Sequence, residues 1–259
     1  MKNRRWKDMT KTERLDELFE KWENKKNEDG TSVFKPKGEL GQFVRDGIVC
    51  PEIYLNIKDK PRILFILKDP NNGDGDYDKH SFLEEIVQCK NSYSTWNEAN
   101  HWAGALYYGK FMYTDIAETD ERYLRPNLRN IAVMNIKKAS GRKSVGYSEL
   151  EPFAINDRVE IIKEIQHLTP DIIIACSRDV FLLLQTKVFK VEKLEDAFVN
   201  KFNERMKSYG RCFDISSFID CKKPVYIVEY RHPNQAGTQG TSKEHYENML
   251  KIREHFFGK

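Results

Sequence analysis

Three polar side chains and one basic run in this chain have the types needed for acid–base chemistry and hydrogen bonding to a ligand. They are Asp69, Asn135, His232 and the run from Lys137 to Lys143. A carboxylate can activate water, an amide can both donate and accept hydrogen bonds, and an imidazole can stabilise a developing anion. The four groups lie far apart in the sequence, so the fold must bring them together if they form one site.

Each of the three polar residues stands at or just beyond the end of a short apolar run that is typical of a buried strand. Four such runs cover residues 62–68, 130–135, 171–176 and 224–230. Helical patterns cover residues 11–27, 81–90, 157–168, 178–184, 194–207 and 242–257. This alternation predicts an α/β fold, a three-layer αβα sandwich around a central, mainly parallel four-stranded sheet. Ligands bind beyond the carboxyl ends of such strands, so we expect the four groups at one sheet edge.

Each group also has an ordinary structural explanation. Asp69 precedes Pro70 and could be a turn or helix-capping residue. Asn135 could be a capping amide, and His232 could be a loop histidine that is bonded locally. The basic run could be a solvated loop. The functional interpretation therefore depends on all four groups falling at the same edge.

Composition excludes several classes of protein. The chain has 259 residues, of which 39% are hydrophobic, and no stretch approaches the roughly 20 apolar residues of a membrane helix. Five cysteines form no CxxC pair, and no Gly-rich phosphate loop is present, so we expect no metal, no cofactor and a cytoplasmic location. The net charge is only +3, so a polyanion site must come from local clusters of Lys and Arg.

The first strand end resembles the first motif of the uracil-DNA glycosylase superfamily. The stretch Asp69-Pro70-Asn71-Asn72 is similar to GQDPYH of the classical branch, with Asp69 at the catalytic aspartate. Phe82 follows Pro70 by twelve residues, which is the spacing of the family's phenylalanine that stacks on the flipped base.

Three further stretches resemble the same superfamily in the same order, so that the resemblance runs from about residue 62 to residue 240. The strand ending at Asn135 resembles the one that carries the base-reading asparagine, and Lys137 follows as in the thermophilic branches. Residues 168–175 resemble the strand that a proline introduces in these branches. Residues 231–234, Arg-His-Pro-Asn, resemble the second motif, HPS, with Asn234 in place of serine.

The resemblance implies a monofunctional DNA glycosylase that hydrolyses the N-glycosidic bond of a flipped-out uracil or modified pyrimidine. Asp69 would stabilise the positive sugar and position the attacking water, while His232 would stabilise the leaving base. Asn135 would bind the polar edge of the base, and Phe82 would stack on it, which offsets part of the cost of base flipping. The phosphate-binding residues would be Lys137, Lys138, Arg142, Lys143 and Asn234.

Asn71 departs from the classical tyrosine that packs against C5 of the base. A smaller polar residue leaves room beside C5, so we also expect it to contact the base. One hypothesis is a C5-substituted substrate, such as the hypermodified cytosine of phage DNA, which would make the protein a defence glycosylase. An equal alternative is that Asn71 only replaces the small residue of other branches.

Two other functions stay open at this point. One is a non-catalytic nucleic-acid-binding protein that keeps a glycosylase-like fold, and the other is a small-molecule α/β enzyme that cleaves free nucleosides. For the organisation of the chain, we expect an N-terminal helical extension packed on the core over residues 1–60 and the glycosylase-like domain over residues 61–259. The expected partner is single- or double-stranded DNA, with no membrane contact, and we expect a monomer.

Overall fold

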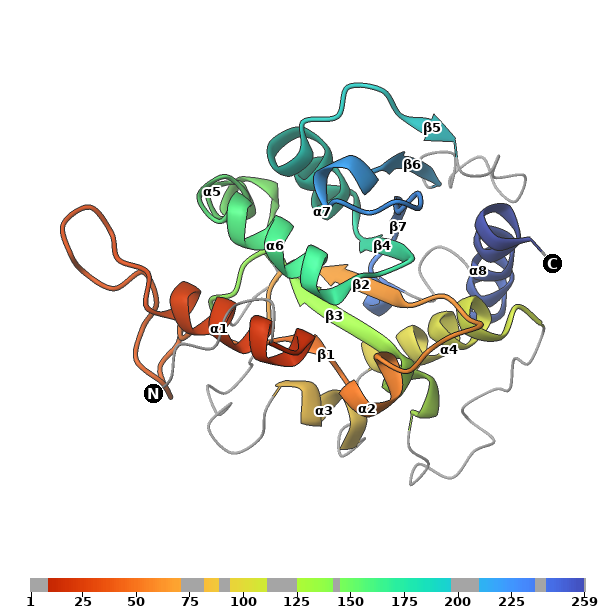
Figure 1. Ribbon diagram of the computed structural model, residues 1–259, viewed down its shortest axis with the longest axis horizontal. Helices are drawn as coiled ribbons and strands as arrows, with labels where there is room; N and C mark the ends of the chain where they lie inside the picture. The colour runs from red at the N-terminus through yellow and green to blue at the C-terminus, as the bar shows by residue number, and fades with distance from the viewer. Residues whose placement is uncertain are drawn as a thin grey trace.

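The computed structural model describes most of the chain (Figure 1). The described residues are 9–70, 82–88, 94–110, 125–141, 145–196, 210–235 and 241–258. Asn71, Arg142 and Lys143 of the predicted site lie outside these residues.

A seven-stranded mixed sheet forms the centre of the molecule, in the order β1-β3-β2-β4-β7-β6-β5. Its strands are β1 (Gly47–Ile48), β2 (Ile63–Leu67), β3 (Ile131–Asn135), β4 (Ile172–Cys176), β5 (Glu195–Asp196), β6 (Arg211–Asp214) and β7 (Tyr226–Tyr230). The four predicted strands β3, β2, β4 and β7 pair in parallel. The remaining three pair antiparallel. The prediction of a mixed α/β protein is therefore correct, but the sheet is larger than the four strands expected.

The helices match most of the helical patterns in the sequence. They are α1 (Lys11–Glu23), α2 (Pro51–Tyr54), α3 (Phe82–Gln88), α4 (Ser94–Tyr108), α5 (Tyr147–Asn156), α6 (Arg158–Leu168), α7 (Arg178–Leu183) and α8 (Ser242–Phe257). Short 3-10 turns cover Pro126–Asn130, Ser216–Phe218 and Pro233–Gln235, and a π-helical turn covers Leu184–Phe189. The helix predicted over residues 194–207 is wrong at its start, because Glu195 and Asp196 pair as β5. None of the described helices is long and apolar enough to cross a bilayer.

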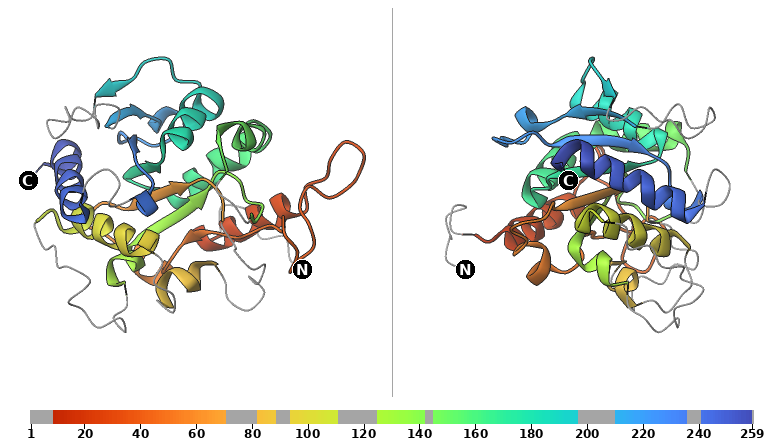
Figure 2. Two further views of the ribbon diagram at one scale, coloured as in Figure 1. Left: turned by 180° about the vertical axis from the view of Figure 1, so that it is seen from behind. Right: turned by 90° about the vertical axis from the view of Figure 1, so that its right-hand side faces the viewer.

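Both faces of the sheet are buried, which explains why its central strands are apolar throughout. Along β2, Leu64 and Ile66 belong to one core cluster, together with side chains of α1, α5, α6 and α7. Ile63, Phe65 and Leu67 point to the other face and belong to a second cluster with α3, α4 and α8. Figure 2 shows α4 and α8 beside one another on their face of the sheet. Successive strand residues alternate between faces, so each central strand must be apolar at every position.

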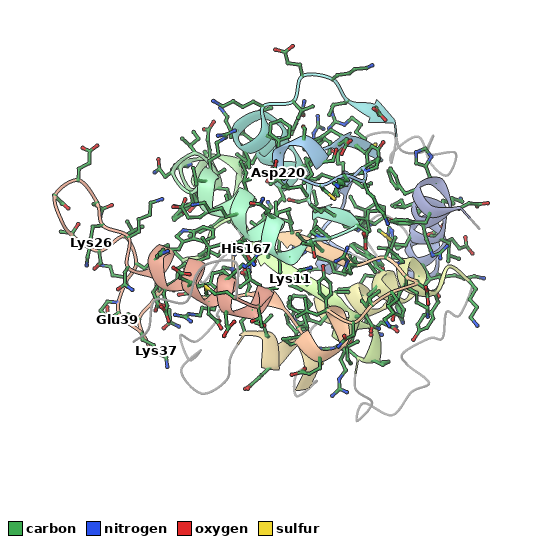
Figure 3. The ribbon with its side chains drawn as sticks, in the orientation of Figure 1. Lys11, Lys26, Lys37, Glu39, His167 and Asp220 are labelled. Atoms are coloured by element: carbon green, nitrogen blue, oxygen red, sulfur yellow. The ribbon has the colours of Figure 1, made fainter. Side chains whose placement is uncertain are left out.

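The N-terminal segment joins this core through a helix and a strand. A capping box starts α1, in which the Glu13 backbone N–H donates to Thr10 Oγ1 at 3.2 Å. The helix packs on α6, and Lys11 Nζ donates to Thr169 Oγ1 at 2.8 Å (Figure 3, where Lys11 lies beside His167 of α6). β1 pairs with β3 and extends the sheet. The boundary at residue 60 stays a prediction.

Candidate functional site

The carboxyl ends of β2 and β3 bring Asp69 and Asn135 to the same edge of the sheet. Leu67 stands opposite Asn135 in the parallel register. Beyond the strands the two chains continue side by side, because the Lys137 N–H donates to the Lys68 carbonyl at 3.0 Å. The Gly141 N–H then donates to the Pro70 carbonyl at 3.1 Å. The segment that carries Asp69 therefore runs along the segment that carries Lys137.

The Asp69 carboxyl group is partly buried, and its Oδ2 atom has no hydrogen-bond partner among the described residues. Burial raises the pKa of this carboxyl, while the charges of Lys137 and Lys68 act in the opposite direction. A Cβ atom built on Gly141 would lie 2.7 Å from Asp69 Oδ2 and 3.7 Å from Lys137 Nζ. Gly141 thus lets the chain pass close to a carboxylate that has an ammonium nearby.

Asn135 is 1% exposed and is held by a residue that the sequence analysis missed. Asp46 Oδ2 accepts hydrogen bonds from the Asn135 backbone N–H at 2.7 Å and from its Nδ2 at 3.1 Å. This contact fixes which way the amide faces, because a carboxylate accepts only from the nitrogen side. Asn135 Oδ1 is buried, and no donor to it lies within the described part of the chain. Asp46 is a single acidic residue just before β1, and no sequence pattern around it predicts a contact with Asn135.

Lys138 does not face solvent, so its predicted contact with DNA phosphate is wrong. Its side chain is 0% exposed, and Nζ lies 2.5 Å from Asp46 Oδ1 and 2.7 Å from Glu164 Oε2. Burial alone would lower the pKa of Lys138, but the two carboxyl groups outweigh it and raise the pKa. Burial and the Asp46 charge raise the pKa of Glu164 well above its usual range. A raised pKa favours the neutral form of Glu164, so the ammonium of Lys138 mainly balances the charge of the Asp46 carboxylate.

His232 lies just beyond β7 on the same edge of the sheet. Its Nδ1 accepts a hydrogen bond from the Asn234 backbone N–H at 3.1 Å. Burial, with a smaller effect of the Lys68 charge, lowers the pKa of His232 to about 4. The ring is therefore neutral at pH 7, and with Nδ1 as acceptor its proton lies on Nε2. A neutral imidazole that carries its proton on Nε2 can donate a hydrogen bond to an oxygen atom of a ligand.

Lys68 connects the groups at this edge. Its Nζ donates to Asp179 Oδ2 of α7 at 2.6 Å and to the Val145 carbonyl at 3.0 Å. Its charge acts to lower the pKa of both Asp69 and His232. Lys68 was not among the predicted site residues, although it directly precedes Asp69.

The other predicted site residues have different surroundings. Phe82 is 7% exposed and packs edge-to-face against Trp96, with ring centroids 5.9 Å apart. Lys137 is partly buried, with Nζ 5.6 Å from the centre of the Phe153 ring, and Asn234 is exposed. Base stacking by Phe82 and phosphate contacts by Lys137 and Asn234 stay predictions.

The comparisons with known proteins add no relative. No known protein family matches the sequence of this chain, and no curated protein is significantly similar to it. Within the described residues, no group of three or more His, Cys, Asp or Glu side chains is arranged to hold a metal ion. The functional interpretation therefore depends on the geometry of this sheet edge.

Proposed function

We propose that this protein is a DNA glycosylase that hydrolyses the N-glycosidic bond of a flipped-out uracil or modified pyrimidine. A C5-substituted cytosine of phage DNA is one candidate substrate, which would give the protein a role in defence. One observation carries the proposal. Two buried oxygen atoms, Asp69 Oδ2 and Asn135 Oδ1, stand at or just beyond the ends of adjacent strands, and neither receives a hydrogen bond from the residues that the structure describes.

Buried acceptors of this kind are uncommon, because each unsatisfied polar group costs about 1–3 kcal/mol. A pyrimidine and a water molecule would supply both missing donors. An N–H on the polar edge of the base would donate to Asn135 Oδ1, and the attacking water would donate to Asp69 Oδ2. Because its pKa is raised, the Asp69 carboxylate is a stronger base than an exposed aspartate and accepts a proton from that water more readily.

The charges around the two oxygens also suit cleavage of an N-glycosidic bond. The bond breaks with positive charge on the sugar, which the Asp69 carboxylate stabilises, and negative charge on the leaving base. His232, neutral and protonated on Nε2, donates a hydrogen bond to an oxygen of that base. Lys137 stands close enough to Asp69 to attract a phosphate next to the reacting sugar.

The proposal includes the finer features expected from the sequence. The sheet with both faces covered supports a three-layer αβα domain of the glycosylase type. DNA is the proposed partner of a monomeric, cytoplasmic enzyme that needs no cofactor. Phe82 would have to leave part of its packing with Trp96 to stack on a base, or the base would stack elsewhere.

The test is base release from a panel of duplexes that carry uracil, a thymine mismatch, or hydroxymethylated or glucosylated cytosine. Mass spectrometry identifies the released base. Asp69→Asn should abolish release and retain DNA binding, because the amide keeps the shape but cannot take the proton. Asp16→Asn, a change at an exposed acid of α1, is the matched control and should release base at the wild-type rate.

Two outcomes would contradict the proposal. DNA binding without release of any base would indicate a non-catalytic nucleic-acid-binding protein. Cleavage of free nucleosides, with no requirement for DNA and little dependence on salt, would indicate a small-molecule enzyme. Release of uracil alone would retain the glycosylase and exclude the hypothesis about C5-substituted bases.

A further inference from the structure

A cavity lies at the opposite, amino edge of the central strands and includes no residue of the proposed glycosylase site. Its volume is about 700 Å³, and its lining includes Pro61, Asp171 and Pro224, which directly precede or nearly precede β2, β4 and β7. The last turns of α8 close one side. The volume falls within the roughly 300–1,000 Å³ of small-molecule sites. We call this cavity the amino-edge pocket.

Positive side chains converge on the amino-edge pocket from three segments. The cations that line it are Lys58, Lys60, Lys223 and Arg253. Lys58 and Lys223 are exposed, and neither has an ion-pair partner within the described part of the chain. Lys60 Nζ lies 4.3 Å from the ring centres of both Tyr107 and Tyr108, so the end of α4 holds it at the pocket.

Arg253 is fixed in place but has hydrogen-bonding capacity left. Its Nη1 donates to the Gly258 carbonyl at 3.1 Å, and its buried Nε has no partner among the described residues. The guanidinium group rests on Gly109, where a Cβ atom would collide with it. A positioned guanidinium with unused donors suits the oxygens of a phosphate group.

Aromatic rings stand beside these cations. Tyr226 and Phe256 pack with centroids 4.7 Å apart and planes inclined by 33°, and both line the pocket. Phe257, the last residue of α8, also lines it and is 38% exposed. Exposed aromatic rings next to cations are the combination that binds a nucleobase together with its phosphate.

The acidic residues of the pocket fit the same kind of ligand. Asp171 is already bound by Arg62, with Nε and Nη2 contacts of 3.1 and 3.2 Å, so it adds little free negative charge. Asp59 and Glu195 are exposed and can accept hydrogen bonds from sugar hydroxyl or base amino groups. A plain polyanion would meet these two carboxylates unfavourably, whereas a nucleoside would not.

We propose that the amino-edge pocket binds a nucleoside phosphate, with its ring against the aromatic side chains and its phosphate against Lys58, Lys223 and Arg253. The ligand is either a free nucleotide or one nucleotide of single-stranded DNA, since both present the same chemistry. This site goes beyond the proposed glycosylase activity and does not depend on it.

Isothermal titration calorimetry on the full chain tests the proposal with five probes. These are thymidine 5′-monophosphate, adenosine 5′-monophosphate, thymidine, inorganic phosphate and an oligothymidylate of eight nucleotides. We expect a nucleotide to bind more tightly than either thymidine or phosphate alone, because the pocket holds both parts. Tighter binding of the oligonucleotide than of the mononucleotide would identify DNA as the source, and the reverse would identify a free nucleotide.

Variants separate this pocket from the glycosylase site. The double substitution Lys58→Glu and Lys223→Glu should weaken nucleotide binding by about tenfold or more, because it reverses two exposed charges. Phe257→Ala should weaken nucleotide binding but leave phosphate binding unchanged. Lys222→Glu, next in sequence but outside the lining, is the matched control and should bind like wild type.

The proposal fails if no nucleotide binds at millimolar concentration, or if the double variant binds as tightly as the control. It also fails if an acidic peptide without nucleobases binds as well as the nucleotides do. Asp69→Asn should bind nucleotide in this pocket like wild type, so loss of base release and loss of this binding are distinguishable.

Discussion

Lys138→Met should destabilise the folded protein strongly and leave its DNA contacts unchanged. Lys138 Nζ is the shared partner of two fully buried carboxyl groups, at 2.5 Å from Asp46 and 2.7 Å from Glu164. Methionine has nearly the same length and volume, so the change removes the charge with little loss of packing. Removing one partner of a buried ion pair typically costs about 3–5 kcal/mol of unfolding free energy, because the other charge stays buried.

Urea unfolding at pH 7 and 25 °C measures this loss. The matched control is Lys163→Met on the exposed side of α6, which should change the unfolding free energy by no more than about 0.5 kcal/mol. The salt dependence of DNA binding gives the second measurement. A lysine that contacts phosphate lowers the slope of log K against log salt by about 1 when it is removed, and Lys138→Met should leave the slope unchanged.

A loss of less than about 1 kcal/mol would refute the buried ion-pair arrangement, since an exposed pair contributes no more than that. A reduced salt slope with normal stability would instead restore Lys138 to the phosphate-binding residues. The two measurements therefore distinguish a structural lysine from a DNA-binding one without any assay of base release.

Three further predictions concern the site itself. Asp46→Asn replaces an acceptor-only carboxylate by an amide that can present either its oxygen or its nitrogen to Asn135, so the Asn135 amide is no longer held in one orientation, and the preference among released bases should weaken by about tenfold, as measured on paired duplexes. Gly141→Ala places a Cβ 2.7 Å from Asp69 Oδ2 and should slow single-turnover base release by at least about tenfold. The rate of base release should rise with pH, because Asp69 must be ionised, and the inflection should lie above the pKa of an exposed aspartate. A pH–rate profile from pH 4 to 8 should show no second inflection near 6.5, because the pKa of His232 is lowered to about 4.

Each of these predictions has a clear contrary result. An unchanged base preference in Asp46→Asn would show that another contact orients the amide. Gly146→Ala is the control for Gly141→Ala, since nothing lies within 4 Å of a Cβ at Gly146, and equal rates in the two variants would contradict the close passage. A rate that falls as pH rises from 4 to 6 would mean that Asp69 acts in its protonated form.

The sign of the pH effect on stability follows from the same pKa shifts. The pKa values of His232 and His245 are both lowered to about 4, chiefly by burial, so the unfolded chain binds more protons below pH 6.5. This contribution to stability is complete above the ordinary histidine pKa and is lost as the pH falls towards 4. The raised pKa of Glu164 has the opposite effect. Stability falls as the pH rises above the ordinary pKa of glutamate, because the folded chain then binds more protons than the unfolded chain.

The sequence predicted the central strands well because their environment is uniform. Residues 63–67 and 172–176 are buried on both faces, and only a continuous apolar run satisfies that position. β1 and β5 have two residues each, and β6 has four with partly exposed ends, so none has a pattern long enough to detect. α4 was missed, although Trp96, Ala99, Ala103 and Leu106 recur at three- and four-residue steps and pack in the core; two of these four residues are small alanines, which make a weak apolar signal.

The candidate site was predictable only where it follows from strand ends. Asp69, Asn135 and His232 reach one edge because parallel strands share their direction. The environment of Lys138 was not predictable, because adjacent lysines after a strand point to different sides and composition does not show which side is buried. Asp46 contacts Asn135 across 89 positions of the chain, and no local pattern reports such a contact.

Asp46 has two structural roles. Its carboxylate pairs with the buried ammonium of Lys138 and also orients the side-chain amide of Asn135 at the end of β3. Most substitutions of Asp46 would therefore lower the stability of the fold as well as change which base is bound, so few of them would be tolerated when the substrate range changes. Substitutions that change base selectivity should occur first at residues near the Asn135 amide that do not stabilise the fold, and variants selected for a new base should retain Asp46.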